Sequence, residues 1–500
     1  MTSPEERATL AKLGGRARAA LAWQFLAKSI TTGLQMLASI ILARLLMPED
    51  FGILAMATMV TGLAAVFQDL GLGQALVQRK DLKPAHITSA FWGTLLMGTS
   101  LCGLMMLAAP YVGTFFKEPQ MTPVLQVISF AFLITPFGVV PRSLLQRELD
   151  FKRPFYAGVI GGVAYAAVGI TMAVSGYSYW SLVAALLASS VAATFVICAL
   201  TGYLPPLIPS LRGVKDLYGF GVGLTATGIL NYVAQKADYL VIARILDSAA
   251  LGLYTKAFEF VHFPFRIISS ISFPVLFPTF AQLQDDLQRV REAFALVLTA
   301  ISLLAFPALA LLAVTAAELV PLLLGEQWQG AVLPIRVLAF AGMLRTVINP
   351  GAALARAFGR VYSQAWRNGV YAIVLTAATL AGTRWHVVGV SFGALMATIV
   401  VFALNAQLVY ACCRFGLGAY VKALRSPVIC TVIVLLAALE TRDLLIGAGQ
   451  DALPVLVVTT IVGMTVGAIF VALDPFRECK TLIRRLLPTA DAADREELPH

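Results

Sequence analysis

The chain has 500 residues, of which 59% are hydrophobic and only 13% charged, with a formal net charge of +10 and a mean hydropathy of +0.82. Soluble domains are about half apolar and about a quarter charged, so this composition excludes a soluble globular protein and indicates that the bilayer is the main solvent. In that setting the positive charge indicates basic cytoplasmic loops rather than nucleic-acid binding.

A helix that crosses a bilayer needs about 20 mostly apolar residues. Runs of that length, separated by charges or by Pro and Gly, predict an all-α membrane protein of about fourteen transmembrane helices. The first run contains Lys28 and is not followed by a signal-peptide cleavage site, so we expect it to be retained as a span. The expected spans are 20–43, 51–70, 87–109, 122–141, 155–175, 179–201, 217–243, 250–278, 293–315, 331–355, 361–382, 386–411, 427–446 and 453–473.

The basic residues between these spans predict the orientation. With a cytoplasmic N-terminus, the inner loops and the two tails carry 26 Lys and Arg, whereas the outer loops carry 5. Because Lys and Arg accumulate on the cytoplasmic side, this asymmetry favours both the number of spans and the placement of both termini in the cytoplasm. We therefore expect a multi-pass membrane protein with both termini in the cytoplasm.

An internal repeat predicts the domain organisation. Segments 35–57 and 235–257 align without a gap at an offset of 200, each across the end of one span, a short outer turn and the start of the next. The identical pairs are Gln35/Gln235, Ala43/Ala243, Arg44/Arg244, Leu46/Leu246, Gly52/Gly252 and Ala57/Ala257. An even number of helices separates the copies, which indicates a parallel repeat of the kind found in transporters, with chance similarity of apolar segments as the alternative.

The repeat divides the chain into two pseudo-symmetric six-helix lobes with two further helices. The expected parts are a cytoplasmic tail 1–19, an N-lobe 20–201, a C-lobe 217–411, two C-terminal helices within 427–473 and a cytoplasmic tail 474–500.

Ionisable and amide side chains inside the predicted spans are the candidate functional residues, because they are costly in a bilayer and usually face a cavity or a partner. Helical spacing puts Gln24, Lys28 and Gln35 on one stripe, and Lys256, Glu259, His262 and Arg266 on one broad face. The candidates for substrate binding are Gln24, Lys28, Gln35, Lys236, Arg266 and Arg345; those for ion coupling or gating are Asp69, Asp238, Glu259 and His262.

Two of the cations are expected at a similar depth. Lys28 lies about 12 Å from the inner end of its span, and Arg266 lies about 24 Å from the outer end of its span. Both positions fall in the inner half of a hydrocarbon core that is about 30 Å thick. If the stripes face each other, they form a cationic pocket suited to phosphate. The alternative is structural, with Lys236–Asp238 and Lys256–Glu259 as ion pairs that only hold helices together.

Several motifs of other function classes are absent from the sequence. It contains no G-x-x-x-x-G-K-[ST] motif for nucleotide phosphates, no His and Glu spacing typical of a metal site, and six cysteines without zinc or disulfide spacing. The outer loops are short and carry few polar residues, which disfavours an enzyme with an extracytoplasmic active site. We expect no cofactor and no metal.

Three segments resemble a known family: ILARLLMPEDFGILAMA in the first outer turn, QDLGLGQALVQRKDL at 68–82 and LLQRELDFKR at 144–153. They look like the Wzx-like oligosaccharide flippases of bacterial polysaccharide export, in the lipopolysaccharide and colanic-acid exporter branch of the multidrug/oligosaccharidyl-lipid/polysaccharide exporter superfamily. The resemblance implies two six-helix bundles around a central cavity. It also implies cavity cations at Lys28, Lys236 and Arg266, and a structural role for Asp69 and Gly71 near the inner gate.

The function that the resemblance implies is transport of an undecaprenyl-diphosphate-linked oligosaccharide from the inner to the outer leaflet, without enzymatic activity. A proton gradient, a sodium gradient or the membrane potential would drive it. The expected partners are the lipid-linked oligosaccharide, the phospholipid bilayer and the polysaccharide polymerase and export machinery, with no nucleic acid. The alternatives are a lipid II or multidrug exporter of the same superfamily, a membrane enzyme such as a polymerase, and an accessory subunit.

Overall fold

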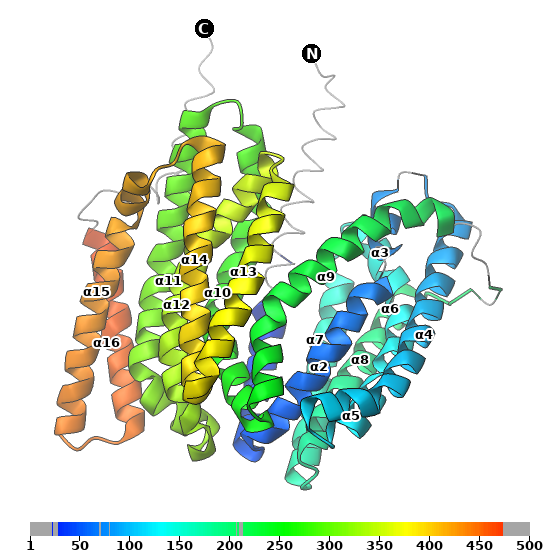
Figure 1. Cartoon of the computed structure of the whole chain (residues 1–500), viewed down its shortest axis with the longest axis horizontal. Helices are drawn as coiled ribbons and strands as arrows, with labels where there is room; N and C mark the ends of the chain where they lie inside the picture. Colours follow the sequence, from blue (N-terminus) through cyan, green and yellow to red (C-terminus); the bar gives the residue numbers. More distant parts are fainter. Residues whose placement is uncertain are drawn as a thin grey trace. The chain divides into compact units, whose positions relative to one another are not determined.

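The computed structural model of the chain describes residue 23 and residues 29–69, 72–79, 81–206, 208–209 and 214–473. Within these ranges, the side chains at 69, 214–227, 230, 265–275, 278 and 361 lie outside the description. Every regular element among the described residues is a helix (Figure 1). The chain forms two compact units, Met1–Thr255 and Lys256–His500, whose division falls inside one long helix.

Among its described residues, the first unit contains an apolar helix at Ser29–Leu45 and eight labelled helices. They are α2 (Pro48–Asp69), α3 (Leu72–Gln78), α4 (Pro84–Phe116), α5 (Met121–Ile128), α6 (Ala131–Arg147), α7 (Lys152–Val174), α8 (Tyr179–Thr201) and α9 (Val214–Ile245). The helix α10 (Ser248–Gln282) begins in this unit and continues into the second.

In the described part of the second unit there are six further long helices and two short 3₁₀ segments. They are α11 (Leu287–Leu324), η1 (Glu326–Ala331), α12 (Val332–Ala357), α13 (Val361–Gly382), η2 (Thr383–Trp385), α14 (His386–Cys413), α15 (Leu417–Gly447) and α16 (Ala452–Leu473). Figure 1 shows α15 and α16 as a neighbouring pair, and both pack against α11.

The all-α membrane fold is confirmed, and a helix corresponds to each of the fourteen expected spans. By length and apolarity, nine helical stretches among the described residues are able to cross a membrane. The expected span 122–141 is two helices, α5 and α6, joined through Ser129 and Phe130. The short helix α3 was not predicted, because seven residues are too few to show a clear periodicity. The chain is a multi-pass membrane protein. The domain limits expected at 201 and 217 stay a prediction.

The core of the second unit contains an aromatic cluster between α11 and the start of α15. Phe294 of α11 lies 5.0 Å from Phe415, and Phe415 lies 4.9 Å from Tyr420 of α15, measured between ring centroids in edge-to-face geometry. This arrangement is favourable for aromatic rings beyond the area that they bury. The pair α15 and α16 is further held by an apolar cluster with α11 that includes Val314, Val434 and Phe470.

Prolines inside the helices leave backbone carbonyls that neighbouring helices satisfy. Pro136 has no N–H, so the carbonyl of Phe132, four residues earlier, loses its helical donor; Gln68 of α2 donates to it at 2.7 Å. Pro427 likewise frees the carbonyl of Ala423, and the hydroxyl of Thr299 on α11 donates to it at 2.8 Å. A membrane offers no water to replace such a bond, so these side chains fix how the helices pack.

Candidate functional site

The structure describes only some of the expected site residues. Gln24 and Lys28 lie outside the described residues, as do the side chains of Asp69 and Arg266. The remaining candidates fall in two groups, one in each unit. Gln35, Lys236 and Asp238 belong to the first unit, and Gln35 is exposed. Glu259, His262 and Arg345 belong to the second.

Arg345 of α12 links three helices in the second unit. One terminal nitrogen of its guanidinium, Nη1, lies 3.3 Å from Nε2 of His262 on α10, and the other, Nη2, donates to the Tyr371 hydroxyl on α13 at 2.5 Å. The Phe258 ring lies 5.5 Å from the guanidinium carbon and 3.9 Å, centroid to centroid, from the His262 ring. Because arginine only donates, His262 accepts through Nε2 in this arrangement.

These contacts orient the guanidinium between an imidazole and a phenol. A held, planar guanidinium with aromatic neighbours is well suited to bind phosphate oxygens. The structure therefore brings Arg345 together with His262, which the sequence placed on separate expected spans with separate roles.

Lys256 forms a different kind of contact. Its side chain is 2% exposed, and its ammonium lies 3.1 Å from the Glu259 carboxylate one turn later on α10. The same ammonium lies 6.0 Å from the centroid of the Trp328 ring, and Trp328 is fully buried in η1. The ion pair is within one helix, so it does not itself join helices, whereas the cation–π contact connects η1 to α10.

Asp238 is buried in the first unit between two helices. Its carboxylate accepts a hydrogen bond from the Tyr254 hydroxyl of α10 at 2.7 Å. Lys236, on the same helix α9, has its ammonium 3.8 Å from the centroid of the Tyr239 ring, and Tyr239 packs edge to face on Tyr254. A buried carboxylate that holds a tyrosine across two helices is a group whose protonation would change helix packing.

The first outer turn of the repeat caps α2 through a carboxylate. Asp50 at the third helical position accepts from the backbone N–H of Met47 at 2.9 Å, and Pro48 occupies the first helical position, where its missing N–H costs nothing. Ser178, at the start of α8, donates to the other oxygen of Asp50. The motif L-x-P-x-D-F-G thus reads as a helix start that is also tied to α8.

In the second turn the carboxylate is on the N-cap residue and the N–H that it accepts from is on the third helical residue, the reverse of the first turn. Asp247 precedes α10 and accepts from the backbone N–H of Ala250 at 2.6 Å. Moving the carboxylate from the third helical position to the N-cap therefore preserves the helix start, which accounts for the difference between the two turns.

The two helix starts touch each other through glycines at equivalent positions of the repeat. A Cβ on Gly52 would overlap the Ser248 carbonyl, and a Cβ on Gly252 would overlap the Pro48 carbonyl. Pro48 and Ser248 are also equivalent in the repeat. The contact is therefore reciprocal, which is independent support for the offset of 200 residues found in the sequence.

The remaining two family-like segments meet on the side expected to be cytoplasmic. Arg147 donates to the carbonyl of Leu76 at 3.2 Å and also to that of Arg79, so it caps the end of α3. Leu72 and Leu76 are buried against α4 and α6. The segments at 68–82 and 144–153 thus act as one structural unit.

Sequence reasoning missed the uncharged partners, namely Phe258, Tyr371, Tyr254, Trp328 and Ser178. Aromatic residues are common in membrane helices, and no periodicity distinguishes those that hold a charged side chain. Only the contacts identify them.

Comparisons with known proteins agree with this architecture. A family model described as "Polysaccharide biosynthesis protein" matches residues 41–333. The lipopolysaccharide biosynthesis protein WzxC of Escherichia coli (strain K12) is 30% identical over 388 residues, which are 76% of this chain and 77% of that protein. The succinoglycan biosynthesis transport protein ExoT of Rhizobium meliloti (strain 1021) is 27% identical over 506 residues, which are 95% of this chain and 96% of that protein.

Two solved structures share the fold. The lipid II flippase MurJ in an inward closed conformation superposes with a TM-score of 0.74 at 11% identity, over 90% of this chain and 97% of MurJ. An inward-facing multidrug resistance MATE family transporter of the MOP superfamily gives a TM-score of 0.63 at 15% identity, over 76% of this chain and 95% of the transporter. The family match covers more than half of the chain, and the resemblance seen in the sequence is confirmed: this chain belongs to the polysaccharide biosynthesis protein family and has the fold of MOP-superfamily flippases and transporters.

Proposed function

We propose that the chain is an alternating-access flippase that moves an undecaprenyl-diphosphate-linked oligosaccharide from the inner to the outer leaflet of the bacterial cytoplasmic membrane, for export of exopolysaccharide or O-antigen. The observation that carries this proposal is the alignment with a polysaccharide transport protein over 95% of the chain. The proposed substrate is an anion, which agrees with the cationic side chains in the expected spans.

In this proposal the diphosphate and its first sugars bind Gln24, Lys28, Gln35, Lys236, Arg266 and Arg345. Arg345 has the best defined geometry of the six, because His262 and Tyr371 hold its guanidinium in place. A diphosphate brings several negatively charged oxygens, and a fixed guanidinium binds such a group through paired hydrogen bonds. The lipid tail stays in the bilayer.

Ion coupling and gating are assigned to Asp69, Asp238, Glu259 and His262, with a proton gradient, a sodium gradient or the membrane potential as the driving force. Asp238 supports this assignment because it is 1% exposed and holds Tyr254 on the next helix. The proposal puts both termini in the cytoplasm and includes the polysaccharide polymerase and export machinery as partners.

The rivals predict different behaviour. A polymerase lengthens sugar chains in reconstituted membranes without moving them across, and an accessory subunit tolerates loss of the intramembrane cations. A lipid II exporter restores peptidoglycan synthesis rather than polysaccharide export. A multidrug exporter confers drug resistance.

The test is rescue of a polysaccharide-export mutant at matched expression, with Lys28→Ala, Arg266→Ala, their double variant and Arg345→Ala. The matched control is Arg336→Ala, because Arg336 lies on the same helix as Arg345, about 180° away, and donates to the Ala313 carbonyl at 3.2 Å. The proposal expects export with Arg336→Ala. It expects lost export and lipid-linked repeat units held in the inner leaflet with the other variants.

Two results would distinguish a wrong assignment of the site residues from a wrong substrate. Normal export by the double variant and by Arg345→Ala would refute the assignment of the cations. Failure of the wild-type chain to rescue, with chain lengthening in vesicles or peptidoglycan rescue instead, would refute the substrate and favour the corresponding rival.

A further inference from the structure

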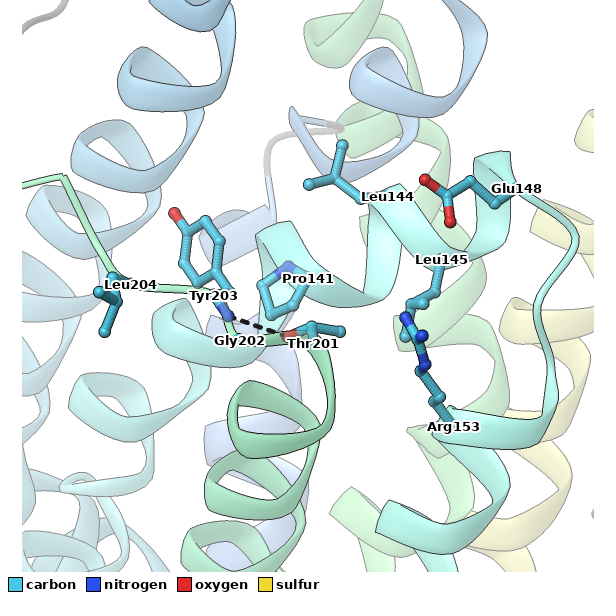
Figure 2. Close-up of a pocket in the computed structure, with 9 residues that line it drawn as sticks. All are labelled: Pro141, Leu144, Leu145, Glu148, Arg153, Thr201, Gly202, Tyr203 and Leu204. Carbon is cyan, nitrogen blue, oxygen red and sulfur yellow. Dashed lines mark hydrogen bonds between the residues drawn. The ribbon is translucent and has the colours of Figure 1, made fainter.

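A pocket of about 340 Å³ lies in the first unit where three helix ends meet, apart from all the residues assigned to transport (Figure 2). The end of α6 forms one wall, Arg153 enters from the first turn of α7, and the end of α8 forms the opposite wall. The lining residues are Pro141, Leu144, Leu145, Glu148, Arg153, Thr201, Gly202, Tyr203 and Leu204.

The pocket combines both signs of charge with an apolar wall. Glu148 and Arg153 lie at one end in Figure 2, and no ion pair joins them. The Nε of Arg153 lies 3.5 Å from Asp150, so this carboxylate orients the guanidinium. Because arginine has five N–H donors, one such contact leaves donors that reach an anion in the pocket.

The helix dipoles also favour an anion near Arg153 and a cation near Glu148. Arg153 is in the first turn of α7, where the helix dipole favours an anion, whereas Glu148 caps the end of α6, where the dipole favours a cation. A carboxylate at a helix C-terminus is unfavourable by itself. A ligand that carries a phosphate and an ammonium group would therefore stabilise both ends.

The opposite end of the pocket has the character of a lipid interface. Leu204, shortly after the end of the membrane helix α8, is 85% exposed. Burial raises the pKa of Tyr203 to about 12, which reflects an apolar environment around its hydroxyl. Large apolar side chains that remain exposed at a helix end are typical of the boundary between lipid headgroups and acyl chains.

The pocket is small for an oligosaccharide. Ligand pockets in proteins span about 300–1,000 Å³, so this one is at the small end and matches a headgroup with its glycerol. A purely anionic headgroup fits the charges less well, because Glu148 would repel its phosphate.

We propose that this pocket binds the headgroup of a zwitterionic aminoethyl-phosphate lipid, with the phosphate on Arg153, the ammonium on Glu148 and the acyl chains along Leu204. The bound lipid holds the ends of α6, α7 and α8 together at the membrane surface. This site goes beyond the proposed transport function and does not depend on it.

The test uses the full-length protein, delipidated in detergent and then exposed to phosphatidylethanolamine or phosphatidylglycerol, with bound lipid counted by native mass spectrometry. The variants are Arg153→Gln, Glu148→Gln and Leu204→Ser, the last at an exposed position, where it removes the apolar contact with the acyl chains. The matched control is Arg289→Gln, because Arg289 lies 3.2 Å from Asp286 in the same i,i+3 arrangement at the start of α11.

We expect the wild type and Arg289→Gln to retain phosphatidylethanolamine in preference to phosphatidylglycerol. Each of the three pocket variants should weaken this binding, and the two charge variants should do so about tenfold, the effect of losing one charge-assisted contact. Equal binding by all variants, or equal loss with Arg289→Gln, would overturn the site. Stronger phosphatidylglycerol binding than phosphatidylethanolamine binding by the wild type would overturn the zwitterionic ligand.

Discussion

The reciprocal glycine contact makes Gly252→Ala the most informative single substitution. The new Cβ would overlap the Pro48 carbonyl and would also lie 3.2 Å from the backbone nitrogen of Gly52. Both are backbone atoms at the start of a helix, so neither can move aside as the end of a flexible side chain would. The starts of α2 and α10 must therefore separate for the methyl group to fit.

The size of the effect follows from the cost of overpacking, which is about 1–3 kcal/mol for an added methyl group in a close contact. If the two helix starts separate during alternating access, the added methyl group destabilises only the state in which they are in contact. An energy of that size shifts a two-state equilibrium about 5- to 150-fold toward the separated arrangement.

The assay is thiol labelling in detergent, with Ala250→Cys as the reporter because Ala250 is 1% exposed at the start of α10. We expect Gly252→Ala to raise its labelling rate about 5- to 150-fold. Met47→Cys, which replaces a side chain that is 55% exposed, should label at an unchanged rate. The control substitution is Gly103→Ala, since nothing lies within 4 Å of a Cβ at that position. An identical reporter rate in Gly252→Ala and Gly103→Ala would refute the reasoning.

Two further predictions concern stability, read as the apparent melting temperature in detergent. Arg442 of α15 lies 2.7 Å from Glu318 of α11, so Glu318→Gln should destabilise the chain by about 1.5–3 kcal/mol, the value of a hydrogen bond to a charged group. Glu440→Gln, at an exposed position of α15, should have no effect. Equal melting temperatures of these two variants would contradict a role for the ion pair. Asp247→Ala removes the acceptor of the Ala250 N–H and should lower the stability by about 1 kcal/mol. Asp247→Asn keeps an acceptor and should be close to wild type. Equal losses of stability in the two variants would show that the charge of Asp247, and not its capping hydrogen bond, matters.

The positions of the membrane helices could be predicted from the sequence because they depend on local composition. The expected span 179–201 coincides with α8, and the expected span 453–473 differs from α16 by one residue. A membrane span must be apolar along its whole length whatever it packs against, so its limits are visible in one segment. The break at Ser129 and Phe130 was not visible, because that region is as apolar as the helices on either side.

The candidate site was predictable only in part. The cost of a charge in the membrane singled out Arg345, His262 and Asp238 from the sequence, but it gave no partner for any of them. Tyr371 and Tyr254 lie on other helices, and their roles depend on side-chain contacts that no spacing rule contains.

For the repeat and the proline sites, too, the sequence shows the residues and only the structure shows their partners. The sequence by itself determined the membrane class, the spans, the offset of 200 residues and the family, because each depends on composition or on local matches along the chain. Only the tertiary structure decided that Gly52 and Gly252 contact each other's helix start and that Gln68 completes the bond left open by Pro136. These are contacts between segments far apart in the chain, and their energies depend on helix packing, which a linear pattern does not specify.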